Sequence, residues 1–183
     1  MRQRGTNSSK PAAFSVLELL VTIVVIGILA VLLIPAISFL RARAQRAQCA
    51  SNLRNLQIAA NLYIQQNGNW PQIRLAGSTG SESAARDYAN AWISALEPFG
   101  PTRKTWICPT IQALFQNPDY STAETARTDY FAMPFDPKPM TPHQWARQPW
   151  FVESGDVHGH GNLIIFTDGS ISDLKTLVGS TPH

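Results

Sequence analysis

The sequence has few of the residues and motifs that mark a catalytic or nucleic-acid-binding protein. Its 183 residues include two cysteines and four histidines, and only 15% are charged. There is no H-E-x-x-H, C-x-x-C or G-x-S-x-G motif and no glycine-rich phosphate loop. Tryptophan and tyrosine are not interleaved with lysine and arginine, as a nucleic-acid platform requires. We therefore expect no enzyme, no cofactor and no nucleic-acid partner.

Charge is almost absent from residues 14–40, which read FSVLELLVTIVVIGILAVLLIPAISFL and contain one ionisable side chain, Glu18. At about 1.5 Å per residue, a helix of this length is longer than the hydrocarbon core of a bilayer, which is roughly 30 Å thick. A carboxylate inside such a segment is costly, so it normally has a partner or a function. The segment predicts a membrane-spanning helix in which Glu18 either has a role or, only five residues into the segment, lies in the headgroup region.

The net charge of +3 comes from the first ten residues, where Arg2, Arg4 and Lys10 supply the whole excess. The rest of the chain is neutral, so the high isoelectric point does not indicate nucleic-acid binding. Counting basic residues on either side of the apolar segment does not fix its orientation, because four arginines follow it between residues 41 and 54.

Phe14, Glu18 and Pro35 together resemble the start of a type IV prepilin or a type II secretion pseudopilin. In that family a peptidase cuts before an apolar segment, and the new first residue, usually Phe, is N-methylated. Glu is the fifth mature residue and Pro is often near the twenty-second. With Phe14 as the first mature residue, Glu18 is the fifth and Pro35 the twenty-second. Ala13 stands where the family usually has Gly.

The resemblance implies a structural subunit, major or minor, of a type II secretion or type IV pilus filament. It implies that residues 1–13 are a cytoplasmic leader that is removed, that 14–40 are the transmembrane and filament-core helix, and that 41–183 are an extracytoplasmic domain. The implied partners are a prepilin peptidase and N-methyltransferase, other pilin or pseudopilin subunits, an inner-membrane assembly platform and membrane lipid. The implied location is the inner membrane, single-pass, with the N-terminus in the cytoplasm. Glu18 would meet the N-terminal amine of a neighbouring subunit.

Two alternatives remain open at this point. One is a secretory signal peptide, because Ala36-Ile37-Ser38 is a passable small-residue cleavage site, although apolar regions of signal peptides are normally about 7–15 residues long. The other is a single-pass envelope protein whose outer domain binds a ligand or a metal and does not polymerise.

The helical pattern continues beyond the apolar segment. Apolar residues recur at spacings of three and four, at Cys49, Leu53, Leu56, Ala60 and Tyr63. Asn67-Gly68 predicts the end of the helix. We therefore expect one helix over about 15–66, bent near Pro35, with an apolar face in its second half that carries a small domain.

The remaining sequence predicts a small α+β domain on that helix. A second, short helix is expected over about 82–97, and the proline-rich region 98–149 reads mostly as loop with extended pieces at 105–108 and 129–133. Residues 162–167 and 170–174 predict an antiparallel hairpin with a two-residue Asp168-Gly169 turn. The expected architecture is a long helix packed on a small antiparallel sheet.

The spacing of His158 from Asp168 and Gly169 is H-x9-D-G, which resembles a subclass of prepilin-like proteins. That subclass also tends to have a Cys before an S-N-L-R-like stretch and a later Cys-Pro, here Cys49 and Cys108. Outside the cytoplasm these two cysteines would persist as a disulfide, which is the pairing we expect. Two buried free thiols remain the alternative.

A metal site is the less favoured interpretation of the histidines. His158 and His160 could form a cluster with Asp156, Asp168, His143 or His183, and a membrane-tethered metalloenzyme built on His158, His160 and Asp168 is a rival function. The spacing matches no zinc motif, so we expect a structural role for His158 and no metal. A calcium site at the loop carboxylates Asp119, Asp129 and Asp136 is equally weakly supported, because their spacing matches no calcium-loop motif.

Overall fold

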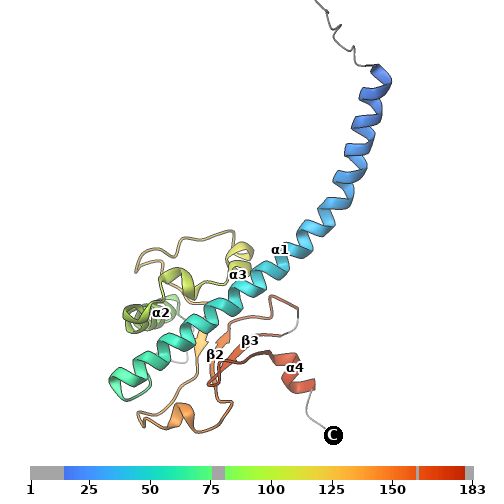
Figure 1. The fold of residues 1–183 in the computed structure, drawn as a ribbon. Coiled ribbons are helices and arrows are strands. Elements are labelled where there is room, and N and C mark those ends of the chain that lie inside the picture. Colours follow the sequence, from blue (N-terminus) through green and yellow to red (C-terminus); the bar gives the residue numbers. More distant parts are fainter. Residues whose placement is uncertain (1–14, 76–80, 160, 180–183) are drawn as a thin grey trace, which may run out of the picture. The chain divides into compact units, whose positions relative to one another are not determined.

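The computed structural model describes residues 15–75, 81–159 and 161–179, and its fold is α+β as predicted (Figure 1). Among these residues the helices are α1 (Val16–Asn67), α2 (Glu82–Leu96), α3 (Pro109–Leu114) and α4 (Leu174–Gly179). The 3-10 helices are η1 (Glu97–Phe99), η2 (Arg103–Trp106) and η3 (Thr141–His143). The strands are β1 (Tyr130–Ala132), β2 (Pro149–Glu153), β3 (Leu163–Phe166) and β4 (Ile171–Asp173). Ala13, Phe14, His160 and His183 lie outside the described residues.

The chain divides into two compact units, residues 1–41 and 42–183. In the first unit α1 begins directly after Ser15, whose Oγ accepts a hydrogen bond from the Leu17 amide at 3.3 Å. Every large apolar side chain described between Val16 and Leu40 is at least 49% exposed. This stretch is long and apolar enough to cross a membrane. Glu18 is exposed in the first turn, and the helix continues through position 35.

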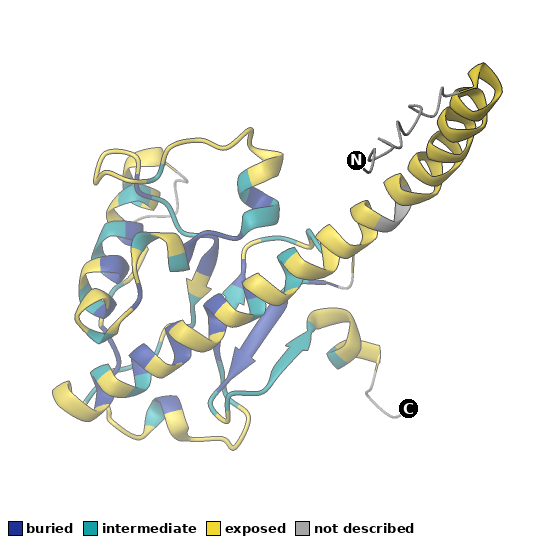
Figure 2. Ribbon diagram, turned by 45° about the horizontal axis from the view of Figure 1, so that its top comes forward, coloured by how far each residue is buried: buried dark blue, intermediate teal, exposed yellow. Residues whose placement is uncertain are grey.

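The second unit begins within α1, where one face of the helix becomes buried (Figure 2). Its buried apolar positions follow the predicted spacing, and the chief ones are Cys49, Leu53, Leu56, Ala60 and Ile64. Long-range polar bonds also hold this face to the domain. Asn52 Nδ2 donates to the Ile107 carbonyl at 3.0 Å, and Gln57 Nε2 donates to the Thr167 carbonyl at 2.9 Å.

The sheet is an antiparallel meander in the order β1-β2-β3-β4. All four residues of β3 are buried, and β3 pairs with a strand on each side, β2 and β4. The pairing of β2 with β3 shifts between Pro149 and Phe151, and this irregularity leaves both Trp150 and Phe151 buried. The sequence did not predict β2, nor the short helices α3 and α4, and the extended piece expected at 105–108 begins instead inside η2.

The β3–β4 hairpin is present as predicted, but its turn differs from the expected two-residue Asp168-Gly169 form. The Gly169 amide donates to the Phe166 carbonyl at 3.0 Å, and the Phe166 amide donates to the Ser170 carbonyl at 3.0 Å. Within this turn only Gly169 has a positive φ, of 77°. The loop therefore has three residues, 167–169, with glycine in the left-handed position, which is the next most common hairpin connection.

The core of the second unit is aromatic. Trp70, Trp92, Trp106 and Trp150 are each at most 1% exposed, whereas Trp145 is 63% exposed. The Trp70 ring lies 5.7 Å from Trp92 and 5.1 Å from Trp150, centroid to centroid. Rings at these distances contribute edge and tilted contacts beyond the area that they bury. These four tryptophans therefore belong to one hydrophobic core cluster.

Candidate functional site

Four side chains with metal-ligating or redox chemistry meet at one buried place in the second unit. They are Cys49, Cys108, Glu153 and His158. One ligand atom from each lies within 4.8 Å of every other. The residues are far apart in sequence and come from α1, the start of α3, the end of β2 and the loop that follows β2. The fold therefore collects them from its helical and sheet layers.

Two of these positions follow from ordinary local structure. Cys49 is on the buried face of α1 and is 0% exposed. Cys108 is the N-cap of α3, where Pro109 at the first helical position fixes the helix start. The Cys108 amide donates to Asp129 Oδ2 at 2.8 Å, and Arg127 Nη2 lies 3.0 Å from the same oxygen. Asp129 thus holds the Cys108 backbone in place.

Glu153 is placed by the sheet. It is the last residue of β2, opposite Tyr130 of β1, and it is 1% exposed. Its backbone carbonyl accepts a hydrogen bond from Asn162 Nδ2 at 2.8 Å, which closes the loop between β2 and β3. Because alternate residues of a strand share a face, Glu153 points to the same side as the core residue Phe151.

His158 is carried by that loop, whose return to β3 is tightly fixed. The Gly161 amide donates to Asp156 Oδ1 at 2.9 Å, and Lys175 Nζ lies 2.9 Å from Asp156 Oδ2. Gly161 has a φ of 88°, and a Cβ there would lie 2.9 Å from the Lys175 amide nitrogen, so only glycine fits. These contacts hold the His158 side chain inward, where it is 4% exposed.

The side chains of the cluster lie close together, but the Glu153 carboxylate is poorly hydrogen-bonded. His158 Nε2 lies 3.3 Å from Glu153 Oε1 and 3.9 Å from Cys108 Sγ. Yet neither Glu153 carboxylate oxygen accepts a hydrogen bond of good geometry from any residue that the structure describes. A buried carboxylate without donors is energetically costly, so the site requires a proton or a cation.

The protonation states of the cluster are mutually dependent. Burial raises the pKa of the Glu153 carboxyl to about 8. A hydrogen bond from the Cys49 thiol lowers the pKa of Cys108 to about 6, and the same bond, with burial, raises the pKa of Cys49. Cys108 is therefore the more acidic thiol of the pair, and Cys49 acts as its donor. Burial also raises the pKa of the neighbouring Tyr130.

The two cysteines are free thiols in this structure, with sulfurs close enough to interact. The expected disulfide between them stays a prediction. The arrangement supports two chemistries that exclude each other, a disulfide and shared coordination of a metal ion.

The residues proposed from sequence as a rival metal set are not brought together among those that the structure describes. His158 joins the cysteines and Glu153, whereas the Asp168 carboxylate accepts a hydrogen bond from the Ser170 amide at 2.9 Å and lies 4.0 Å from Arg147. Sequence reasoning missed Glu153. The only local signal was a carboxylate directly after the apolar residues 149–152.

The three carboxylates considered as calcium ligands, Asp119, Asp129 and Asp136, make other interactions. Asp129 supports Cys108, as described above. Asp119 and Asp136 accept hydrogen bonds within their own loops, from the Ser121 amide and the Lys138 amide, both at 3.0 Å. Such Asx-type bonds stabilise turns, and they leave these carboxylates in three separate environments.

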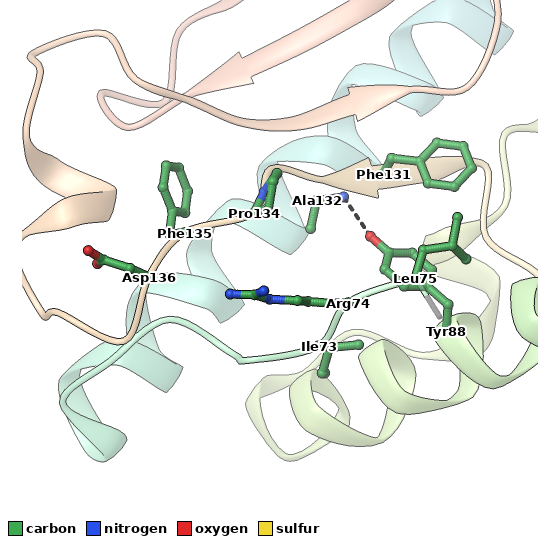
Figure 3. A pocket seen from close by; sticks show the side chains of 9 residues that line it. All are labelled: Ile73, Arg74, Leu75, Tyr88, Phe131, Ala132, Pro134, Phe135 and Asp136. Atoms are coloured by element: carbon green, nitrogen blue, oxygen red, sulfur yellow. Dashed lines mark hydrogen bonds between the residues drawn. The ribbon is translucent and has the colours of Figure 1, made fainter. Parts of the chain in front are cut away.

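A separate open cleft of about 540 Å³ lies between the segment after α1, α2 and β1 (Figure 3). Its walls are mainly apolar, with Arg74 and Asp136 as the charged residues. Tyr88 Oη accepts a hydrogen bond from the Ala132 amide at 3.1 Å, which ties α2 to β1. The lining contains no cysteine or histidine, so the cleft is chemically distinct from the buried cluster.

Comparison with protein-family models, with curated proteins and with solved structures found no match to the chain.

Proposed function

We propose that the protein is a structural subunit of a type II secretion pseudopilus or a type IV pilus. The observation that carries the proposal is α1, a single helix whose first part is apolar on every side and whose second part buries one face in a small domain. A filament subunit needs this division, because the first part must pack against lipid and then against other subunits, while the second carries the displayed domain.

The sequence pattern at the start of α1 supports the same proposal. The helix begins two residues after Phe14, and Glu18 is the only ionisable side chain between residues 14 and 40. In the proposed mechanism a prepilin peptidase cuts after Ala13 and the Phe14 amine is methylated. The domain from residue 41 onward then lies outside the cytoplasm, and the subunit is extracted from the inner membrane by an assembly platform.

Electrostatics explains why Glu18 would be retained in so apolar a segment. The mature N-terminal amine and the Glu18 carboxylate would both be buried in a filament core. Neither charge is stable there alone, and pairing between neighbouring subunits offsets part of the desolvation cost of each. The pair would also set the axial register, because an apolar surface without other charges has many near-equivalent packings.

Replacement of Glu18 tests this mechanism. In Glu18→Ala the buried amine of the neighbouring subunit loses its partner, so we expect membrane insertion to persist and incorporation into sheared, sedimented filaments to fall at least about tenfold, equivalent to roughly 1.4 kcal/mol or more. The measurement is quantitative immunoblotting of membrane and filament fractions from the native host.

Glu82→Ala is the matched control, because Glu82 is an exposed carboxylate in the first turn of another helix, α2. It should be incorporated like the unmodified chain. Normal incorporation of Glu18→Ala would reject the assigned role of Glu18. Absence of the unmodified chain from the filament fraction would favour a membrane-anchored protein that does not polymerise.

A further inference from the structure

We propose that Cys49, Cys108, Glu153 and His158 bind one zinc ion in tetrahedral coordination. The ion would join α1 to β2 and to the loops before α3 and β3, and so lock the sheet layer onto the helix. This proposal is independent of filament assembly, because all four residues belong to the second unit.

The geometry is close to that of a zinc site before any movement of side chains. With Zn–S bonds of about 2.3 Å and Zn–N or Zn–O bonds of about 2.0–2.2 Å, tetrahedral ligand atoms lie roughly 3.3–3.8 Å apart. The His158 Nε2 to Glu153 Oε1 distance is 3.3 Å, and the His158 Nε2 to Cys108 Sγ distance is 3.9 Å. All four atoms are within 4.8 Å of one another, so small rotamer adjustments suffice.

The carboxylate supplies the second, independent observation. Glu153 has a side chain that is 0% exposed, and neither of its oxygens accepts a hydrogen bond of good geometry from the described residues, although His158 Nε2 lies 3.3 Å from Oε1. A divalent cation at the centre would compensate the carboxylate and two thiolates together, leaving a net charge of −1 in place of −3.

The ligand types select zinc over the common hard cations. Calcium and magnesium prefer oxygen ligands, whereas thiolate and imidazole together are typical of zinc. Four protein ligands also fill the tetrahedral sphere, which is the pattern of a structural site and leaves no position for substrate. Binding releases the thiol protons and, where the carboxyl is protonated, its proton to solvent, with no change in oxidation state.

A disulfide between Cys49 and Cys108 is the competing state, because it would consume both thiolates. The two states are distinguishable by mass, since the disulfide form is lighter by two hydrogen atoms and holds no metal. The test uses the full chain, extracted from membranes in detergent without chelator or added reductant. Intact mass spectrometry under denaturing conditions and metal analysis of the same sample give the two readouts.

We expect free thiols and about one zinc per chain, with a Co²⁺-substituted form that shows tetrahedral visible bands and thiolate-to-metal charge transfer. Cys49→Ser, Cys108→Ser, Glu153→Gln and His158→Gln should each lower zinc retention through gel filtration at least about tenfold. Asp168→Asn is the matched control, because this carboxylate lies in the same H-x9-D-G pattern but outside the cluster, and it should retain the metal.

Because a variant that lacks a ligand could fail to fold, the unmodified chain gives the deciding result. A chain isolated as the Cys49–Cys108 disulfide without metal would overturn the proposal. So would a chain with free thiols that, after equilibration with Zn²⁺, retains no metal and shows no increase in Tm. Zinc loss in Asp168→Asn equal to that in His158→Gln would also overturn the ligand assignment.

Discussion

Single buried polar residues determine how α1 is fixed to the domain. Asn52 is 5% exposed, and its Nδ2 donates to the Ile107 carbonyl at 3.0 Å. Ile107 directly precedes Cys108, so this bond helps to keep the second cysteine beside Cys49, three residues before Asn52 on the same helix. Asn52, a polar residue on the apolar face of α1, thereby helps to position the distant segment that contains Ile107 and Cys108.

Removing the Asn52 amide should therefore be costly. In Asn52→Ala the Ile107 carbonyl loses a buried donor and a small cavity forms, so we expect the free energy of unfolding to fall by about 1–3 kcal/mol. Denaturant unfolding followed by tryptophan fluorescence measures this, since four tryptophans are buried. Asn55→Ala, at an exposed position of the same helix, should change stability by less than about 0.5 kcal/mol. Equal effects of the two substitutions would show that the Asn52 bond contributes little.

Among the helices and strands, the sequence predicted those that are marked by a regular spacing of apolar residues within the element itself. The spacing of Cys49, Leu53 and Leu56 predicts the buried face of α1, and the apolar run before Asp168-Gly169 predicts the hairpin. Strand β2 was not predicted, because it begins at a proline and contains a register shift that removes the strict alternation of apolar residues. The turn type was wrong because three-residue and two-residue loops share the same Asp-Gly signal.

The site was only partly predictable for the same reason. Cys49 and Cys108 were expected to meet as a disulfide, because disulfides persist outside the cytoplasm. Glu153 and His158 join them only through the β2 pairing and the loop closed by Gly161, which are long-range features. No local pattern in the sequence reports such a juxtaposition.

The hairpin itself can be tested at Gly169. A Cβ at this position would meet no atom within 4 Å, so the cost of Gly169→Ala comes from its φ of 77° alone. We expect a loss of about 1–2 kcal/mol in the free energy of unfolding, and a smaller loss for Gly169→Asn, because asparagine tolerates the left-handed region better. The measurement is the same denaturant titration.

Gly155→Ala is the control for the hairpin substitution. Gly155 is not among the described residues with positive φ, and its Cβ would make an ordinary 3.6 Å contact with Val157. This variant should be near neutral. If Gly169→Ala were as stable as Gly155→Ala, the left-handed turn would not be the conformation of the hairpin in solution.

At the scale of the whole molecule, the chain consists of two units with opposite demands on their surroundings. The large apolar side chains described between residues 16 and 40 are 49–83% exposed, so this stretch favours an apolar environment such as lipid or other subunits. Residues 42–183 bury an aromatic core and a polar cluster of their own. The proposed pilin-type subunit would reconcile these demands, because its helix would pass from the membrane into a filament while the domain stays folded in water.

The proposed function requires that the apolar segment be processed and used as a prepilin N-terminus. Mass spectrometry of the N-terminal peptide from protein isolated out of native membranes tests this requirement. We expect a chain that starts at Phe14, with a methyl group on the Phe14 amine. A chain that still carries residues before Phe14, or one that starts near Phe39 after cleavage by a signal peptidase, would contradict it.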